Sequence, residues 1–111
     1  MILVTGAAGF IGHRLCARLL DDGHDVVGVD CFLTASYDPA VKRAAVAPLR
    51  AQPRFTFVAA DLRHDDLDLS GADVVIHLAA MPGLQQGRRA DAAYESCNIK
   101  ATRRLLAAGW P

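Results

Sequence analysis

Glycines recur every third residue near the start of this chain. Gly6, Gly9 and Gly12 follow directly on the apolar run 1–4 and precede a stretch with helical apolar spacing. A tight turn from strand to helix needs glycine where φ is positive, where the backbone approaches a ligand, and where helix and strand pack closely. The first amides of such a helix carry partial positive charge that favours phosphate. The placement of these glycines therefore predicts a cradle for the phosphates of a dinucleotide.

An acidic residue follows the second apolar run. Asp30 ends the run 26–29 and lies 18 residues beyond Gly12. A carboxylate at this position can accept hydrogen bonds from an adenosine ribose, and its charge would repel a 2′-phosphate. The glycine turn and Asp30 together predict NAD rather than NADP. The alternative is that Asp30 only caps a strand end in solvent.

The composition fits one α/β domain of helices packed on a sheet. The 111 residues are 52% hydrophobic with few aromatics, which is typical of that class. Because 12 basic and 12 acidic residues give a net charge of +0, the charge offers no argument for nucleic acid or an anionic membrane as a partner. No run approaches the ~20 apolar residues of a membrane span, and the N-terminal run is too short for a signal peptide, so we expect a cytoplasmic protein.

The cysteines do not suggest a metal site. Cys16, Cys31 and Cys97 are widely separated and form no C-x-x-C pair, which argues against both a disulfide framework and a zinc site. Cys31, next to Asp30, is either a redox-sensitive thiol near the cofactor or a plain buried one.

Apolar spacing predicts four strands, at 1–4, 26–29, 54–58 and 73–80. The last of these is the clearest buried strand. Segment 62–72 holds at most one helical turn. In the order β-α-β-α-β-β-α, these elements predict a doubly wound, Rossmann-type parallel sheet with strand order 3-2-1-4, and a ligand site beyond the carboxyl ends of the strands.

Three helices are expected between or after these strands. In the first, an inward stripe of Ile11, Leu15, Leu19 and Leu20 ends at Gly23, which acts as a left-handed cap. The second begins at Asp38 as N-cap and Pro39, runs through Val41, Ala44 and Ala45, and is limited or kinked by Pro48. The third covers about 90–108 with one stripe of Tyr94, Cys97, Ala101, Leu105 and Ala108, and loops at 31–37 and 82–87 complete the chain.

Five blocks in this order resemble the extended short-chain dehydrogenase/reductase family, the NAD-dependent epimerases and dehydratases of nucleotide sugars. The blocks are Thr5–Gly12, Asp30, Asp61–Arg63, His77–Ala80 and Asn98. The match covers essentially all of residues 1–111. Within the family, segments 37–44 and 81–84 look most like the branch of UDP-glucuronate and UDP-glucose epimerases.

The resemblance implies roles for particular residues. It assigns the glycine turn to the pyrophosphate, Asp30 to the adenosine ribose, 61–62 to the adenine, and 78–80 to the nicotinamide half. The residues expected to contact NAD are Gly6, Ala8, Gly9, Phe10, Ile11, Gly12, Asp30, Asp61, Leu62, Leu78, Ala79 and Ala80.

Two further residues have competing interpretations. The family uses the position of Asn98 to order an active-site strand from a helix, while spacing alone fits an exposed polar residue equally well. His77 fits a hydrogen-bonded histidine inside the sheet better than a catalytic base.

The family's catalytic pair is missing from this sequence. These enzymes use a tyrosine whose acidity is raised by a lysine four residues later. Here Tyr37 is followed at that distance by Val41, and Tyr94 by Asn98. We therefore predict no catalytic residue in 1–111, which would be the N-terminal, NAD-binding portion of an epimerase or dehydratase without its catalytic and substrate-binding part. The alternative is a non-catalytic module that binds or senses NAD and pairs with a partner chain.

The predicted strand at 73–79 would form an unprotected sheet edge. No charge or proline lies between Val74 and Ala79, and native edge strands commonly use both to prevent pairing with other chains. We therefore expect the isolated chain to associate with itself through this edge.

Overall fold

Four parallel strands form a single sheet in the order β3-β2-β1-β4. The computed structural model describes residues 1–33, 38–82 and 91–109. The strands are β1 (Ile2–Thr5), β2 (Val26–Asp30), β3 (Phe55–Ala59) and β4 (Val74–His77). The predicted strand order is confirmed.

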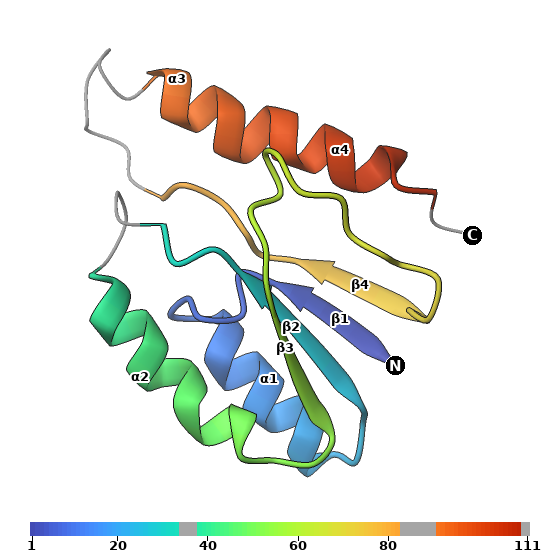
Figure 1. Cartoon of the computed structure of the whole chain (residues 1–111). Coiled ribbons are helices and arrows are strands. Elements are labelled where there is room, and N and C mark those ends of the chain that lie inside the picture. The colour runs from blue at the N-terminus through green and yellow to red at the C-terminus, as the bar shows by residue number, and fades with distance from the viewer. Residues whose placement is uncertain (34–37, 83–90, 110–111) are drawn as a thin grey trace.

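Helices cover both faces of this sheet (Figure 1). On one face lie α1 (Gly12–Asp21) and α2 (Pro39–Arg50). Across the other runs a continuous helical stretch made of α3 (Asp91–Tyr94), the π-helical segment η2 (Glu95–Lys100) and α4 (Ala101–Ala107). The result is the three-layer arrangement of a doubly wound α/β domain.

Alternation along the strands builds two separate apolar clusters. Val4 packs with residues of α1 and α2, among them Cys16 and Val46. Its neighbour Leu3 points to the opposite face and packs with Ala101 and Leu105 of α4. Successive strand side chains face opposite sides of a sheet, so both faces of these central strands are buried.

The predicted ends of the first two helices are largely confirmed. Gly23 has a φ of +88° after α1, and the Asp38 side chain accepts a hydrogen bond of 2.8 Å from the amide of Ala40. Pro48 does not end α2, which continues to Arg50. Because Pro48 and Ala44 lie on the exposed side of the helix, water can reach the carbonyl that a proline leaves without its helical partner.

The inward stripe expected for the first helix is confirmed except for Ile11. Leu20 is buried in the core, and Leu15 and Leu19 are partly buried and pack against it. The Ile11 side chain is 65% exposed, whereas Gly12, Cys16 and Leu20 face the core. Helix α1 contacts the glycine turn through Gly12, so Ile11, the residue before it, points outward. On α2, similarly, Val41 is 62% exposed and the buried positions are Lys42, Val46 and Leu49.

The last strand and helix also differ from prediction. The strand expected over 73–80 pairs only over Val74–His77, and it is half-buried, with Val74 45% exposed. Among the described residues β4 pairs only with β1, which leaves its other edge open. The stripe of the third helix includes the buried Cys97, Ala101 and Leu105, but Ala108 is exposed. The loops expected at 31–37 and 82–87 lie partly outside the described residues.

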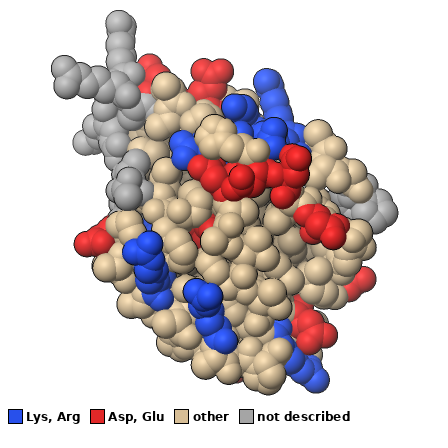
Figure 2. All heavy atoms as spheres, viewed as in Figure 1, with Lys and Arg blue, Asp and Glu red and all other residues tan. Residues whose placement is uncertain are grey.

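Charges of both signs share the face of the molecule seen in Figure 2.

Across the described parts of the chain, no helix is long and apolar enough to cross a membrane. The same residues contain no cluster of three or more histidine, cysteine or acidic side chains able to hold a metal ion.

The burial pattern of α2 can be tested with two valines of one helix. Val46→Ala should lower the free energy of unfolding by roughly 2 kcal/mol, because its side chain is 1% exposed and its removal leaves a cavity. Val41→Ala, on the exposed side, should change it by less than about 0.5 kcal/mol. Urea unfolding measures both, and equal effects would contradict the observed helix orientation.

Candidate dinucleotide-binding site

A cleft of about 340 Å³ opens at the carboxyl ends of the four strands. Eleven of the twelve residues predicted to contact NAD line it: Gly6, Gly9, Phe10, Ile11, Gly12, Asp30, Asp61, Leu62, Leu78, Ala79 and Ala80. The exception is Ala8, which is 3% exposed and packs in the core. The structure therefore brings together four segments that are far apart in the sequence.

The glycine turn is held by very close backbone contacts. Gly6 has a φ of +71°, and a Cβ added to Gly12 would lie 1.9 Å from the carbonyl oxygen of Gly6. The amide of Ala7 donates to the carbonyl of Val29, at 3.1 Å, which ties the turn to β2. Among the described residues, the amides of Phe10 and Ile11 have no acceptor. Two free N–H groups just before a ten-residue helix suit an anionic oxygen.

Asp30 is fixed by two backbone amides. Its Oδ2 accepts from Ala8 N at 3.0 Å and its Oδ1 from Phe32 N at 2.8 Å. Phe32 has a φ of 55° and its ring lies 5.4 Å from that of Phe57. Each carboxylate oxygen keeps a second lone pair, so Asp30 can still accept from a ligand hydroxyl. Ala8, although outside the cleft, therefore supports it through Asp30.

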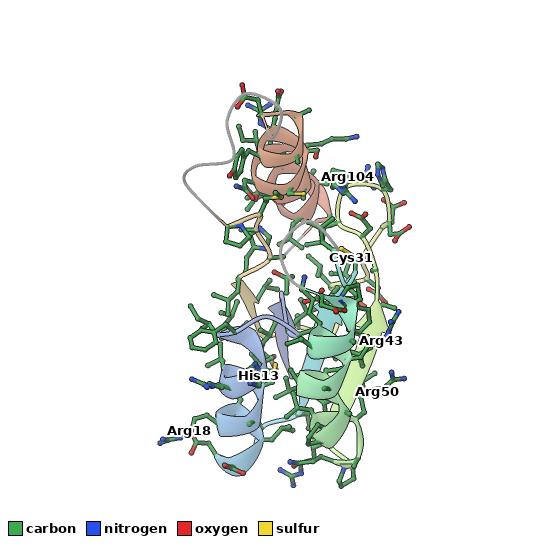
Figure 3. The ribbon with its side chains drawn as sticks, turned by 90° about the vertical axis from the view of Figure 1, so that its left-hand side faces the viewer. His13, Arg18, Cys31, Arg43, Arg50 and Arg104 are labelled. Atoms are coloured by element: carbon green, nitrogen blue, oxygen red, sulfur yellow. The ribbon has the colours of Figure 1, made fainter. Side chains whose placement is uncertain are left out.

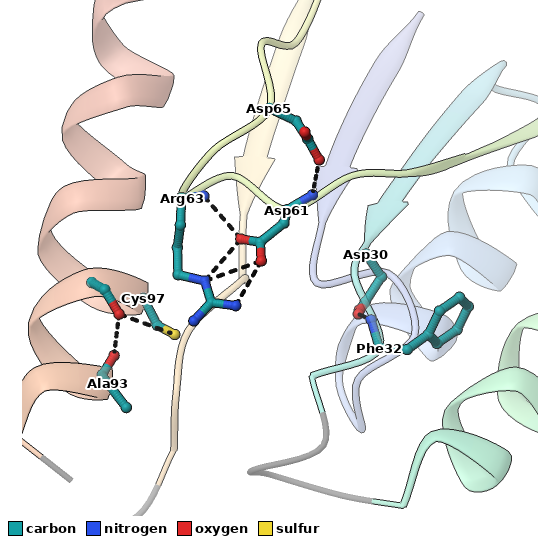
Figure 4. Close-up of polar contacts among 8 residues, drawn as sticks. Asp30, Phe32, Asp61, Arg63, Asp65, Ala93 and Cys97 are labelled. Atoms are coloured by element: carbon teal, nitrogen blue, oxygen red, sulfur yellow. Dashed lines mark hydrogen bonds and ion pairs between the residues drawn. The ribbon is translucent and has the colours of Figure 1, made fainter.

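A second carboxylate, just after the neighbouring strand β3, is clamped by arginine (Figure 4). Arg63 Nη2 lies 2.6 Å from Asp61 Oδ2, and Arg63 Nε lies 2.9 Å from Asp61 Oδ1. These bonds from Arg63 lower the pKa of the Asp61 carboxyl. Asp65 accepts from the amide of Asp61 at 2.8 Å and fixes the backbone beside it. Asp61 is thus held as an ionised acceptor at the wall of the cleft.

The segment after β4 forms the floor of the cleft with small side chains. The amide of Leu78 donates to the carbonyl of Thr5 at 3.2 Å, and that of Ala79 to Thr5 Oγ1 at 3.2 Å. A Cβ on Gly6 would lie 2.8 Å from the nitrogen of Ala79. The backbones of the glycine turn and of this segment are therefore in direct contact, and no side chain from either lies between them.

Several lining residues were not predicted. Lys42 is 6% exposed and donates to the carbonyl of Leu33 at 3.1 Å, while Arg63 and Cys97 line the wall near α4. A lysine in the first turns of a helix is ordinarily on the surface, so no sequence signal points to Lys42. Arg63 had a signal, since it stands two residues after Asp61, a spacing that permits the observed side-chain clamp.

The two interpretations of Cys31 are both modified by the structure. Cys31 is exposed rather than buried, and lies at the end of β2 between the two helix layers (Figure 3). Its partial desolvation, followed by the negative charges of Asp61 and Asp30, raises the pKa of its thiol. Because the thiolate is the reactive form, the desolvation and these carboxylates together disfavour a reactive Cys31.

His77 and Asn98 are both hydrogen-bonded inside the protein. The ring of His77 contacts Thr5 Oγ1 at 2.6 Å and Thr102 Oγ1 at 2.9 Å. Asn98 Oδ1 accepts from Met81 N at 2.6 Å. His77 is therefore the structural histidine that the sequence favoured, and Asn98 is not a free surface residue.

Together these features define a dinucleotide-binding α/β domain. The glycine turn offers unpaired amides for phosphate, and the two ordered carboxylates offer acceptors for hydroxyl and amino groups. Residues 2–109 match the model of the NAD dependent epimerase/dehydratase family. The chain belongs to this family.

Individual relatives support the same placement. The chain is 44% identical to an uncharacterized UDP-glucose epimerase of Bacillus subtilis, over 96% of this chain and 35% of that protein. It is 36% identical to a probable UDP-glucuronate 4-epimerase of Rhizobium meliloti, over 94% of this chain and 32% of that protein. The chain thus spans about a third of the length of the curated relatives it matches.

Solved structures agree with these relatives. The crystal structure of UDP-glucuronic acid 4-epimerase from Bacillus cereus in complex with NAD superposes with a TM-score of 0.85 at 42% identity, covering 96% of this chain and 35% of that one. The described residues therefore have the fold of the corresponding third of the epimerase.

The close contact inside the glycine turn generates a test. Gly12→Ala should lower the free energy of unfolding by roughly 3 kcal/mol, because its Cβ would meet the carbonyl oxygen of Gly6. Gly71→Ala is the matched control, since its Cβ would lie 3.4 Å from the nearest atom, the flexible end of Met1. Thermal unfolding by circular dichroism compares them, and a Gly12→Ala protein as stable as Gly71→Ala would contradict the observed turn.

Proposed function

We propose that this chain binds NAD in the cleft and is the cofactor-binding portion of a UDP-sugar epimerase. The observation that carries the proposal is the convergence of the glycine turn, Asp30, Asp61 and residues 78–80 on one cleft. The names of the relatives support UDP-glucuronate or UDP-glucose as the sugar nucleotide of the intact enzyme.

Each part of the cleft suits one part of NAD. The free amides of Phe10 and Ile11 would donate to the pyrophosphate. Asp30 would accept from the adenosine ribose, and the negative charge that it adds to the pocket opposes a 2′-phosphate. Asp61, ionised beside Arg63, would accept from the adenine amino group. The small residues Ala79 and Ala80 would leave room for the nicotinamide half.

The chain by itself would bind cofactor without turning over substrate. NAD, when bound, supplies a hydride acceptor for a sugar carbon. Moving the hydroxyl proton needs a base, and neither Tyr37 nor Tyr94 has a lysine four residues later. Within the proposal, residues 1–111 therefore hold and orient the cofactor in a cytoplasmic enzyme whose acid/base groups lie outside this sequence.

Cofactor choice tests the proposal directly. Isothermal titration of the purified chain should show NAD binding at least about tenfold tighter than NADP, since a like charge beside Asp30 is unfavourable. Asp30→Asn should reduce that preference, while Asp21→Asn, the same change of charge on an exposed position of α1, should leave it unaltered. Failure to bind NAD, or equal affinity for both cofactors, would contradict the assignment.

The open edge of β4 favours association as a second property. Val74 is 45% exposed on a strand that pairs only with β1 among the described residues, and such an edge can pair with another chain. This edge is also what a non-catalytic module would use to join a partner.

Sedimentation can test association through this edge. We expect the chain to form concentration-dependent oligomers, and Val74→Lys to weaken them by placing a charge on the edge. Val41→Lys makes the same change at a 62% exposed position of α2 and should have no effect. A monomer at all concentrations, or equal effects of the two substitutions, would overturn the prediction.

A further inference from the structure

The floor of the cleft is the segment that directly follows β4 in the sequence. Residues 78–80 follow the end of β4 and line the cleft. Past Leu78, the next backbone amide, that of Ala79, donates to the side chain of Thr5 rather than to a strand. Thr5 is 0% exposed, so its hydroxyl must find its partners inside the protein. A group that holds the Thr5 hydroxyl in place therefore also holds Ala79 in the floor.

The ring of His77 connects Thr5 to the helix on the same side of the cleft. His77 stands beside Thr5 in the β1–β4 register. Its Nδ1 lies 2.6 Å from Thr5 Oγ1, and its Nε2 lies 2.9 Å from Thr102 Oγ1 at the start of α4. Thr102 in turn donates to the carbonyl of Asn98 at 2.8 Å.

The hydroxyl protons determine which ring nitrogen carries hydrogen. A threonine hydroxyl has one proton, and that of Thr102 is given to Asn98. Thr102 must therefore accept from His77, which places the proton on Nε2. The unprotonated Nδ1 then accepts from Thr5, whose oxygen accepts from Ala79. In this series each group donates to the next: Ala79 to Thr5, Thr5 to His77, His77 to Thr102, and Thr102 to Asn98.

The residue at the far end of this chain of hydrogen bonds, Asn98, also holds Met81, which directly follows the floor segment 78–80. Asn98 Oδ1 accepts from the amide of Met81 at 2.6 Å, and its Nδ2 donates to the Met81 carbonyl at 3.2 Å. Asn98 belongs to the π-helical segment η2, a rare backbone form that is frequently found at functional sites. The floor is therefore held at Ala79 by Thr5 and at Met81 by Asn98, with His77 joining the two supports.

We infer that His77, neutral and protonated on Nε2, is a positioning residue that holds residues 78–81 in place for the nicotinamide half of the cofactor. This inference rests on the proposed function for the identity of the ligand. Its physical content, a single directed chain of hydrogen bonds through the ring, does not depend on any ligand.

A charged ring would break this arrangement. With both nitrogens protonated, Thr5 Oγ1 would accept from His77 and from Ala79, and its own proton would lose its present acceptor at a fully buried site. Thr5 and Thr102, which face the ring from β1 and α4, do not ionise and cannot balance the charge. Burial alone lowers the pKa of His77. Cofactor affinity should therefore be full above this pKa and fall as acid protonates the ring.

Nitrogen NMR of the histidine-labelled chain tests the tautomer without cofactor. We expect the His77 ring to carry its proton on Nε2 at neutral pH and to titrate below the ordinary range of histidine. A proton on Nδ1, or a ring that titrates like a free histidine, would overturn the inference.

Two substitutions of Thr102 test positioning. Thr102→Val removes the hydroxyl at nearly constant shape, and should speed hydrogen exchange at the amides of Ala79 and Met81 and weaken NAD binding roughly tenfold. Thr102→Ser keeps the hydroxyl and should restore both. Arg103→Ala, an exposed neighbour on the same helix, is the control and should change neither.

The possible results separate the two proposals. If the unmodified chain binds no NAD, the proposed function fails, and the tautomer and exchange measurements still decide the role of His77. If NAD binds and Thr102→Val neither speeds exchange at Ala79 and Met81 nor weakens binding, His77 does not position the floor.

Discussion

The contact between Gly12 and the carbonyl of Gly6 is the constraint on which this structure depends. It sets the start of α1 directly on the end of β1, with no room for a Cβ between them. The helix therefore begins at once after the turn, and Phe10 and Ile11, which line the cleft, keep amides without an acceptor among the described residues. The contact between Gly12 and Gly6 is therefore the cause both of the close packing and of the free donors for a phosphate.

The polar groups around the cleft serve the fold and the ligand together. Asp30 accepts from Ala8 and Phe32, and so orders the turn that it faces. Asp61 is held by Arg63 from its own loop. Because these side chains are fixed before any ligand arrives, little conformational entropy remains to be lost on binding, which is the physical meaning of a pre-organised site.

Sequence reasoning succeeded where one short-range rule decides the outcome. Gly23 could be predicted because glycine tolerates the positive φ that ends α1, and Asp38 because its side chain accepts from the helix amide two residues later. It failed where tertiary packing chose between faces. Ile11 fits the apolar spacing of α1 as well as Cys16 does, yet only the contact of Gly12 with the turn shows which of them is buried.

The sequence by itself determined the strand order and the glycine turn, because both follow from local pattern and the handedness of parallel crossovers. Its resemblance to the family pointed to eleven of the twenty residues that line the cleft. Only the tertiary structure decided that β4 ends at His77, that Lys42 lies buried at the cleft, and that His77 links Thr5 to Thr102. The His77 links join residues far apart in the chain, and the direction of a hydrogen bond between distant side chains leaves no periodic signal in sequence.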